Sequence, residues 1–237
     1  MNIRKTGYIL TLMFLVFLKN TGSAWSIDFQ KPSYAFVTGD YKSAFHQWTS
    51  LAKQGNASAQ TRVGLMYDKG EGVSQSRQTA VKWYRLAAGQ GFAIAQSNLA
   101  AMYQFGEGVT QNQQTSAKWY RLAAKQGYAN AQSKMGRILD SGQAIPHNNK
   151  TAIKWYRLAA EQGNADAQNS LGVMYYSGNG VAINNITAHM WFNIAASAGY
   201  RNASLDKDFL AKIMSTEEIS TAGNLALDCI SKNYKGC

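Results

Sequence analysis

Ala152-Ile-Lys-Trp-Tyr-Arg-Leu-Ala-Ala-Glu-Gln-Gly163 is one of four copies of the same stretch in this chain. The other copies are Ala80-Val-Lys-Trp-Tyr-Arg-Leu-Ala-Ala-Gly-Gln-Gly91, Ser116-Ala-Lys-Trp-Tyr-Arg-Leu-Ala-Ala-Lys-Gln-Gly127 and Ala188-His-Met-Trp-Phe-Asn-Ile-Ala-Ala-Ser-Ala-Gly199. Their final glycines follow one another at intervals of 36 residues, and Gly55 continues the series toward the N-terminus. Self-similarity of this period is typical of proteins built from stacked repeats.

A second stretch recurs in the same register. Its copies are Ala59-Gln-Thr-Arg-Val-Gly-Leu-Met-Tyr67, Ala95-Gln-Ser-Asn-Leu-Ala-Ala-Met-Tyr103, Ala131-Gln-Ser-Lys-Met-Gly-Arg-Ile-Leu139 and Ala167-Gln-Asn-Ser-Leu-Gly-Val-Met-Tyr175. Most copies lead into a loop such as Gly70-Glu-Gly-Val73, whereas the third leads into Gly142-Gln-Ala-Ile145-Pro146. Because glycine marks turns, each repeat is predicted to hold two short elements and two turns.

Both elements have helical spacing. Ala80, Tyr84 and Ala87 share one face of the first stretch, and Ala59, Val63 and Met66 share one face of the second. A single pair of such amphipathic helices cannot bury both of its faces, but a stack of pairs can. The sequence therefore predicts a helical solenoid. The tryptophans and tyrosines that recur once per repeat are interpreted as core residues rather than as platforms for a ligand.

The combined pattern Ala-Gln-x-x-Leu-Gly-x-Met-Tyr-x-x-Gly-x-Gly-Val and Ala-x-x-Trp-Tyr-x-x-Ala-Ala-x-Gln-Gly resembles the Sel-1-like repeat, a relative of the tetratricopeptide repeat. This resemblance implies an all-α fold, an α-solenoid of helix-turn-helix repeats wound into a right-handed superhelix. Four repeats are expected, at 57–91, 92–127, 128–163 and 164–199. Ala100 and Leu139 depart from the pattern, where glycine and tyrosine are expected.

The ends of the array are predicted to act as caps. Residues 25–39 form an arm without clear period, and 40–56 form half a repeat in which Trp48 takes the position of Tyr84. Residues 200–237 are expected to add two helices, one near 205–213 and one that starts at the capping-box pattern Ser215-Thr-Glu-Glu218. Altered terminal units close the core of a solenoid against water.

The N-terminus has the features of a secretory signal peptide. Arg4 and Lys5 precede an apolar run at 8–18, and small residues follow up to Ala24. Residues 1–24 are therefore predicted to be cleaved, the alternative being an uncleaved anchor. Export is expected, to the periplasm or alternatively out of the cell, with no transmembrane segment after cleavage. In an exported protein the spacing of Cys229 and Cys237 favours a disulfide over two free thiols.

Composition narrows the possible functions. The 237 residues are 46% hydrophobic with only 2 prolines, which excludes a disordered chain. There are 24 basic and 13 acidic residues, and loss of Arg4, Lys5 and Lys19 with the signal peptide leaves 21 against 13, a net charge of +8. This basic surface favours an anionic partner. Export disfavours nucleic acid as the partner. A protein partner is therefore expected, and the net positive charge is compatible with an acidic protein.

Catalytic, cofactor and metal sites are not expected. Two cysteines and three scattered histidines leave little from which to build a metal centre. Some Sel-1-like proteins are described as penicillin-binding or β-lactamase-like, and Ser-x-x-Lys occurs at Ser50-Leu-Ala-Lys53 and Ser204-Leu-Asp-Lys207. About one such match is expected by chance, and the companion Lys5-Thr6-Gly7 lies in the signal peptide. A penicillin-recognising protein therefore remains only the alternative.

Binding residues should lie where the repeats differ. In Sel-1-like arrays the helix of the Ala-Gln pattern lines the concave surface. The resemblance therefore implies that the unburied positions of this helix in the present chain face a partner. The residues predicted to contact a partner segment are Arg62, Asn98, Gln104, Lys134, Arg137 and Tyr176. The alternative is that these side chains are simply solvated.

The other helix carries a regular set of cations, Lys82 with Arg85, Lys118 with Arg121, and Lys154 with Arg157. These cations are expected to face outward, where they could attract an acidic protein or anionic lipid headgroups. The alternative is that they contact only solvent. The sequence as a whole predicts a non-catalytic protein-interaction scaffold or adaptor of a bacterial envelope. A secreted effector that binds a host protein is a further alternative. The sequence does not predict the oligomeric state.

Overall fold

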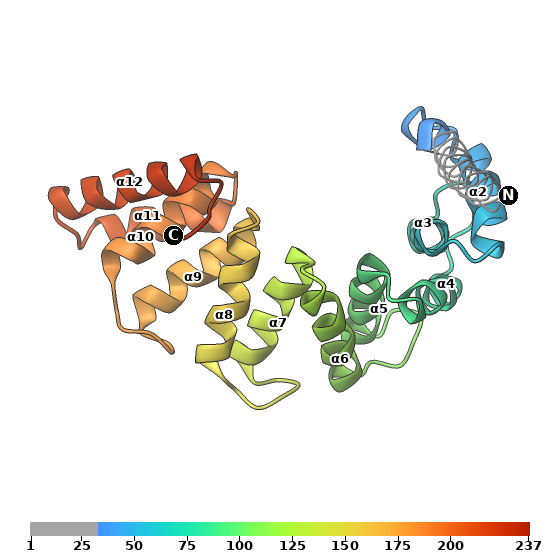
Figure 1. Cartoon of the computed structure of the whole chain (residues 1–237), viewed down its shortest axis with the longest axis horizontal. Coiled ribbons are helices and arrows are strands. Elements are labelled where there is room, and N and C mark those ends of the chain that lie inside the picture. The colour runs from blue at the N-terminus through green and yellow to red at the C-terminus, as the bar shows by residue number, and fades with distance from the viewer. Residues whose placement is uncertain (1–32) are drawn as a thin grey trace, which may run out of the picture. The chain divides into compact units, whose positions relative to one another are not determined.

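The computed structural model describes residues 33–237, and the predicted signal peptide and the first part of the arm lie outside this range. Within it the chain is helical and contains no strand, which confirms the predicted all-α solenoid (Figure 1). The helices are α2 (Tyr41–Lys53), α3 (Ala57–Lys69), α4 (Arg77–Gly89), α5 (Ala93–Phe105), α6 (Gln113–Lys125), α7 (Ala129–Ser141), α8 (Asn149–Ala160), α9 (Ala165–Ser177), α10 (Asn185–Ser197), α11 (Arg201–Ala211) and α12 (Thr216–Ser231). Two compact units divide at Leu86 within α4.

The helix boundaries follow from the residues at the ends of each repeat. Asparagine side chains at the N-caps of α6, α8 and α10 accept a hydrogen bond from a backbone N–H of the first turn, at 2.8–2.9 Å. Gly142 ends α7 with φ 68°, a left-handed conformation that glycine adopts at little cost. The divergent loop that follows differs at Ala144, which does not share the positive φ of the corresponding Gly180.

In the first unit, the core lies between α2 and α3. Its buried residues are Ala44, Trp48, Ala52, Ala59, Val63 and Met66. The ring of Phe36, which belongs to a short helical segment at 33–37, packs 5.3 Å from Trp48. Trp48 is thus buried as its position in the half-repeat predicts.

In the second unit, from Ala87 onward, consecutive helices from α5 to α10 pack against one another (Figure 1). Alanine and glycine keep the helices close, and the tyrosines fill the space between them. A Cβ added at Gly136 would lie 2.5 Å from Cδ1 of Tyr156. The buried tyrosines and the buried or partly buried tryptophans of the repeats belong to this core.

Glutamines link the layers of the array. Gln96, Gln132 and Gln168 each donate a hydrogen bond from Nε2 to a carbonyl of the preceding helix, at 3.2–3.3 Å. The Nε2 groups of Gln126 and Gln162 in turn donate to Oε1 of Gln96 and Gln132, at 2.8 and 2.7 Å. The recurring glutamines therefore tie helix to helix, as buried amides must be satisfied.

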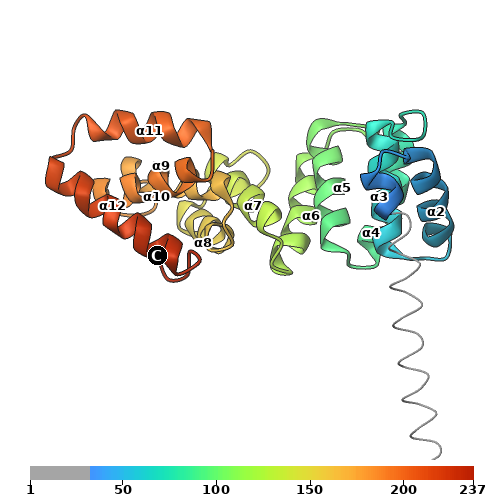
Figure 2. The same ribbon diagram turned by 90° about the horizontal axis from the view of Figure 1, so that it is seen from above.

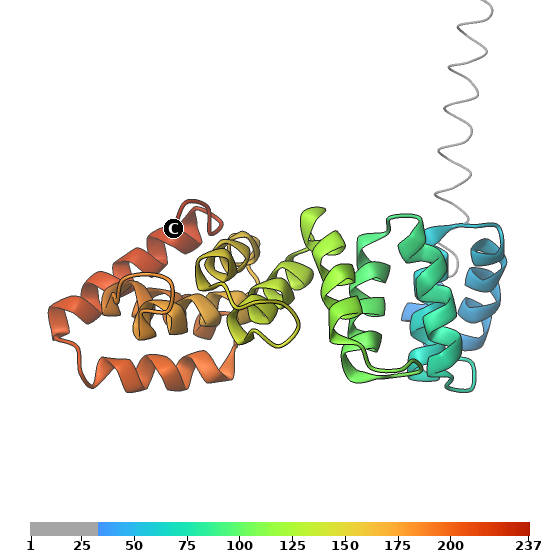
Figure 3. The ribbon, with the colours of Figure 1, turned by 90° about the horizontal axis from the view of Figure 1, so that it is seen from below.

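In the C-terminal cap the structure differs from the sequence prediction at one helix boundary. α11 begins at Arg201 rather than near Leu205, because the repeat register continues beyond Gly199 and buries Ala203. Ser215 and Glu218 form the expected capping box at the start of α12. α11 and α12 lie on either side of α10 (Figure 2, Figure 3).

A disulfide joins Cys229 to Cys237, so the pairing expected from their spacing is present in the structure. In the same terminal segment, the ring of Tyr234 lies beside Gly163 at the turn between α8 and α9. The helices within residues 33–237 are too short or too polar to cross a membrane.

Candidate binding pocket

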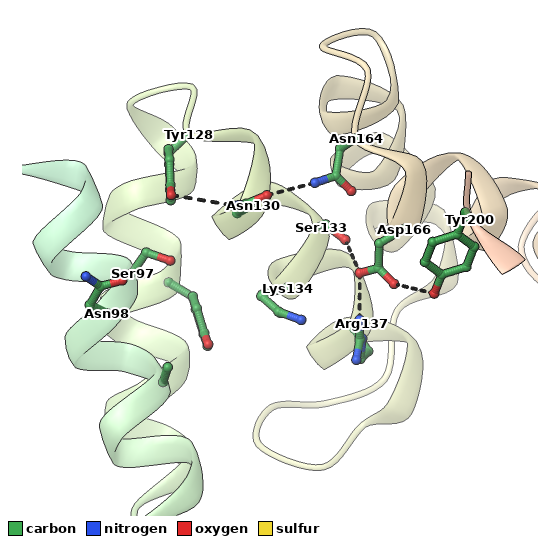
Figure 4. A pocket seen from close by; sticks show the side chains of 12 residues that line it. Ser97, Asn98, Tyr128, Asn130, Ser133, Lys134, Arg137, Asn164, Asp166 and Tyr200 are labelled. Carbon is green, nitrogen blue, oxygen red and sulfur yellow. Dashed lines mark hydrogen bonds and ion pairs between the residues drawn. The ribbon is translucent and has the colours of Figure 1, made fainter. Parts of the chain in front are cut away.

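A pocket of about 440 Å³ opens in the second unit (Figure 4). We call it the unit-2 pocket, and its lining residues are Ser97, Asn98, Ala101, Tyr120, Tyr128, Asn130, Ser133, Lys134, Arg137, Asn164, Asp166 and Tyr200. Most of these side chains are polar, and three are charged. The pocket therefore offers hydrogen-bonding groups over a volume large enough for several side chains or a short piece of backbone.

Helical spacing and the repeat period together assemble the pocket. Ser97, Asn98 and Ala101 share one face of α5, and one repeat later Ser133, Lys134 and Arg137 share the same face of α7. The remaining polar residues come mainly from the start of a helix, where the chain enters a new repeat. Equivalent positions of successive repeats therefore face a common space.

Asp166 is the centre of a hydrogen-bond network on one wall of the pocket. Its Oδ2 accepts from the hydroxyl of Ser133 at 2.9 Å and pairs with the guanidinium of Arg137 at 2.6 Å. Its Oδ1 accepts from the hydroxyl of Tyr200 at 3.1 Å. Burial raises the pKa of Asp166, but these bonds and the charges of Arg137 and Lys134 outweigh burial and lower the pKa overall.

Lys134 has no such partner. It lies half-buried on the pocket wall, and within residues 33–237 its ammonium makes no hydrogen bond or ion pair (Figure 4). Burial, together with the nearby charge of Arg137, lowers the pKa of Lys134, although Asp166 acts in the opposite direction. The arrangement leaves one uncompensated cation facing the pocket, which favours an anionic group in a ligand.

Amide and phenol groups complete the lining. Asn164 donates from Nδ2 to Oδ1 of Asn130 at 2.9 Å, so the two side chains form a polar ledge across adjacent repeats. Burial raises the pKa of Tyr120 to about 12, and its hydroxyl donates to Oε1 of Gln104 at 3.1 Å. These groups are neutral donors and acceptors of the kind that bind a peptide backbone.

The structure brings together three of the six residues predicted for partner contacts, namely Asn98, Lys134 and Arg137, all in the unit-2 pocket. Gln104 lies in the same unit but not on the pocket wall, and its carbonyl accepts bonds from Gln111 and Gln113 in the following loop. The other two also lie elsewhere. Tyr176 packs edge-on against Phe209 at 6.3 Å, and Arg62, in the first unit, lies 5.8 Å above the ring of Trp48.

The sequence analysis missed the pocket residues at the helix starts, Tyr128, Asn130, Asn164, Asp166 and Tyr200. A signal for them exists, because these positions differ from repeat to repeat. Asn130 and Asp166, for example, correspond to Ile94, which lies one repeat before Asn130 and two repeats before Asp166. The contact residues predicted from the sequence all lie beyond the first turn of their helices, so they do not include these positions.

Comparison with known proteins identifies the repeat. The Sel1 repeat matches residues 57–92, 93–128, 129–164 and 165–200, each ending one residue later than expected. A Sel1 repeat protein from Oxalobacter formigenes is 33% identical, with a TM-score of 0.75 over 85% of this chain and 82% of that one. A protective antigen of uropathogenic Escherichia coli with an SLR fold is 34% identical, with a TM-score of 0.71 over 81% of this chain.

The chain spans only 42% of the length of that antigen. A sel1 repeat protein from Klebsiella pneumoniae, 18% identical, shares the fold with a TM-score of 0.52 over 78% of this chain and 91% of that one. No curated protein matches the sequence. The four matched repeats make up more than half of the sequence, and the chain belongs to the Sel1 repeat family.

Proposed function

We propose that this protein is a non-catalytic interaction scaffold that holds an extended segment of a partner protein in the unit-2 pocket, with a carboxylate of that segment at Lys134. Sel1 repeat proteins generally mediate protein–protein interaction, and the family is typically a non-catalytic scaffold. The observation that carries the proposal is the half-buried ammonium of Lys134, which faces the pocket without a partner among residues 33–237.

The chemistry of the pocket suits a polypeptide. Amides and hydroxyls on its wall can pair with the N–H and C=O groups of an extended backbone. A carboxylate beside Lys134 would form a charge-assisted hydrogen bond, which is about twice as strong as a neutral one. The two Ser-x-x-Lys motifs contribute nothing to this site, because neither Ser50 nor Ser204 lines the pocket.

The location of the scaffold is part of the same proposal. The predicted signal peptide supports a place in a bacterial envelope, and the similarity to a protective antigen of uropathogenic Escherichia coli suits an envelope or a secreted protein. In either place the same pocket would bind the partner.

Site-specific photo-crosslinking in the source cells would test the pocket. A photoreactive amino acid at Asn98, on the pocket wall, should capture a distinct protein, whereas the same group at exposed Asn224 of α12, which does not line the pocket, should not. Capture of the same protein from Asn224 alone would place the interface elsewhere and contradict the proposal.

The captured protein then allows a quantitative test of Lys134. Lys134→Met keeps the length of the side chain but removes its charge, and we expect it to weaken binding about tenfold or more. The matched control is Lys212→Met, because Lys212 is exposed and does not line the pocket. Equal affinities for the two variants in calorimetry would show that Lys134 does not hold the partner.

A further inference from the structure

The outward faces of α6 and α8 carry cations that the unit-2 pocket does not use. We call this surface the basic face; it consists of Lys118, Arg121 and Lys125 on α6 and Lys150, Lys154 and Arg157 on α8. All six side chains are exposed, and none lines the pocket. Neither helix contains an aspartate or glutamate, and Glu161 follows only as the C-cap of α8. The face therefore has a strong net positive charge.

Each helix also exposes a leucine among these cations. Leu122 and Leu158 are each 46% exposed, and they occupy the same position in successive repeats. On α6 the stripe formed by Lys118, Arg121 and Leu122 lies opposite the buried residues that face the core. The stripe of α8 repeats this arrangement one repeat further along the array.

The next repeat shows what happens when the cations are replaced. Met190 and Ile194 stand on α10 at the positions of Lys154 and Leu158, and they are only 6% and 1% exposed. α12 packs against α10 there. The chain thus covers this helix where its outer positions are apolar, and leaves α6 and α8 exposed where they are basic.

We infer that the basic face binds an anionic phospholipid bilayer. Headgroup phosphates would pair with the cations, and the two leucines would enter the boundary with the acyl chains. A bilayer presents the same anionic groups over its whole surface, so it matches a face on which identical side chains recur from repeat to repeat. This binding is independent of the partner segment proposed for the unit-2 pocket.

Vesicle sedimentation tests the inference. The chain from Trp25 onward contains every described residue and lacks the apolar run at 8–18, which would itself bind lipid. We expect it to bind vesicles of phosphatidylglycerol and phosphatidylcholine at low salt, and to be released at about 0.5 M salt, where charges are screened within about 4 Å. Equal binding to vesicles of phosphatidylcholine alone would overturn the proposal.

Two variants with the same net charge distinguish lipid binding by the basic face from binding that depends only on the overall positive charge of the protein. In the first variant, glutamine replaces four cations of the basic face, namely Lys118, Arg121, Lys125 and Lys154. The second replaces four scattered, exposed cations, Lys53, Lys69, Arg201 and Lys212. Since each basic residue near an anionic surface contributes about a fivefold change in partitioning, the first variant should bind at least about tenfold more weakly than the second. Equal partitioning of the two would refute the inference.

The leucines and the competing partner give the last two readouts. Leu122→Gln with Leu158→Gln should reduce binding to anionic vesicles while the thermal melt is unchanged, because both side chains are exposed. Unchanged binding would refute insertion of the leucines. Should the chain bind polyglutamate but no anionic vesicle, the face would be a site for acidic protein and the bilayer proposal would be wrong.

Discussion

The glutamine ladder makes a quantitative prediction because it is broken at one place. Gln126 and Gln162 lie just after the C-terminal ends of α6 and α8 and donate to Oε1 of the buried Gln96 and Gln132. The corresponding residue of the next repeat is Ala198, and Oε1 of Gln168 has no donor within the described part of the chain. Gln168 is completely buried, so Oε1 of Gln168 lacks a hydrogen-bond donor in the protein interior. A new donor should stabilise the fold most at such a buried acceptor.

Ala198→Gln should therefore stabilise the second unit, and Gln162→Ala should destabilise it. The added side chain supplies a hydrogen bond worth about 1 kcal/mol, after the loss of water and of rotamer freedom is included. Removal of Gln162 leaves Oε1 of Gln132, a residue only 4% exposed, without its 2.7 Å donor, at a cost of about 1–2 kcal/mol. In a unit of this size, 1 kcal/mol corresponds to a shift of about 2–4 °C in Tm.

Thermal and urea unfolding followed by circular dichroism would measure both changes. The matched control is Gln54→Ala, because Gln54 occupies the same helix-terminal position of the half-repeat and its side chain bonds to nothing within residues 33–237. We expect the control to leave Tm within about 1 °C, as most surface substitutions do. The reasoning would be refuted by an Ala198→Gln variant no more stable than the parent, together with a Gln162→Ala variant no less stable than the control.

Three further predictions concern packing, pH and the terminal bond. Gly136→Ala should cost about 1–3 kcal/mol in urea unfolding, because its Cβ would lie 2.5 Å from the buried ring of Tyr156; an unchanged midpoint would contradict the close packing. Asp166→Asn should lower Tm at pH 7, and the difference from the parent should disappear only well below pH 3.8: the lowered pKa of this carboxyl stabilises the fold above its ordinary pKa, and this stabilisation is lost as the pH falls through the lower pKa of the folded state. Reduction of Cys229–Cys237 should destabilise the cap by about 2 kcal/mol, whereas the same reductant should leave a double serine variant unchanged.

The fold was predictable from the sequence because the residues that end the helices and the residues that face the core recur at the same positions of every repeat. Glycines at fixed intervals end the helices, and the alanine and tyrosine positions mark the buried face. The beginning of α11 was misplaced for a related reason. After Gly199 the chain keeps the helix register but loses the glycine loop, and only Ala203 in the position of Ala167 marks the continuation.

The pocket was only partly predictable, because it depends on contacts between repeats. Helical spacing alone places Asn98, Lys134 and Arg137 on exposed helix positions, and the pocket includes all three. The contacts of Asp166 reach residues 29 to 34 positions away in sequence. Such contacts arise from the way one repeat stacks on the next, and a one-dimensional pattern does not contain that geometry.

The stacking also changes which cation is available to a ligand. Arg137 and Lys134 are both basic and both on α7, so the same role was predicted for both. In the structure the guanidinium of Arg137 is paired with Asp166 at 2.6 Å, whereas the ammonium of Lys134 makes no ion pair within residues 33–237. A ligand with a single carboxylate can bind at Lys134 and leave that ion pair intact. A ligand that drew Arg137 away from Asp166 would leave that carboxylate with only the hydroxyls of Ser133 and Tyr200, and the half-exposed ion pair that it breaks contributes on the order of 1 kcal/mol. The pocket therefore discriminates in favour of one isolated negative charge over two adjacent ones.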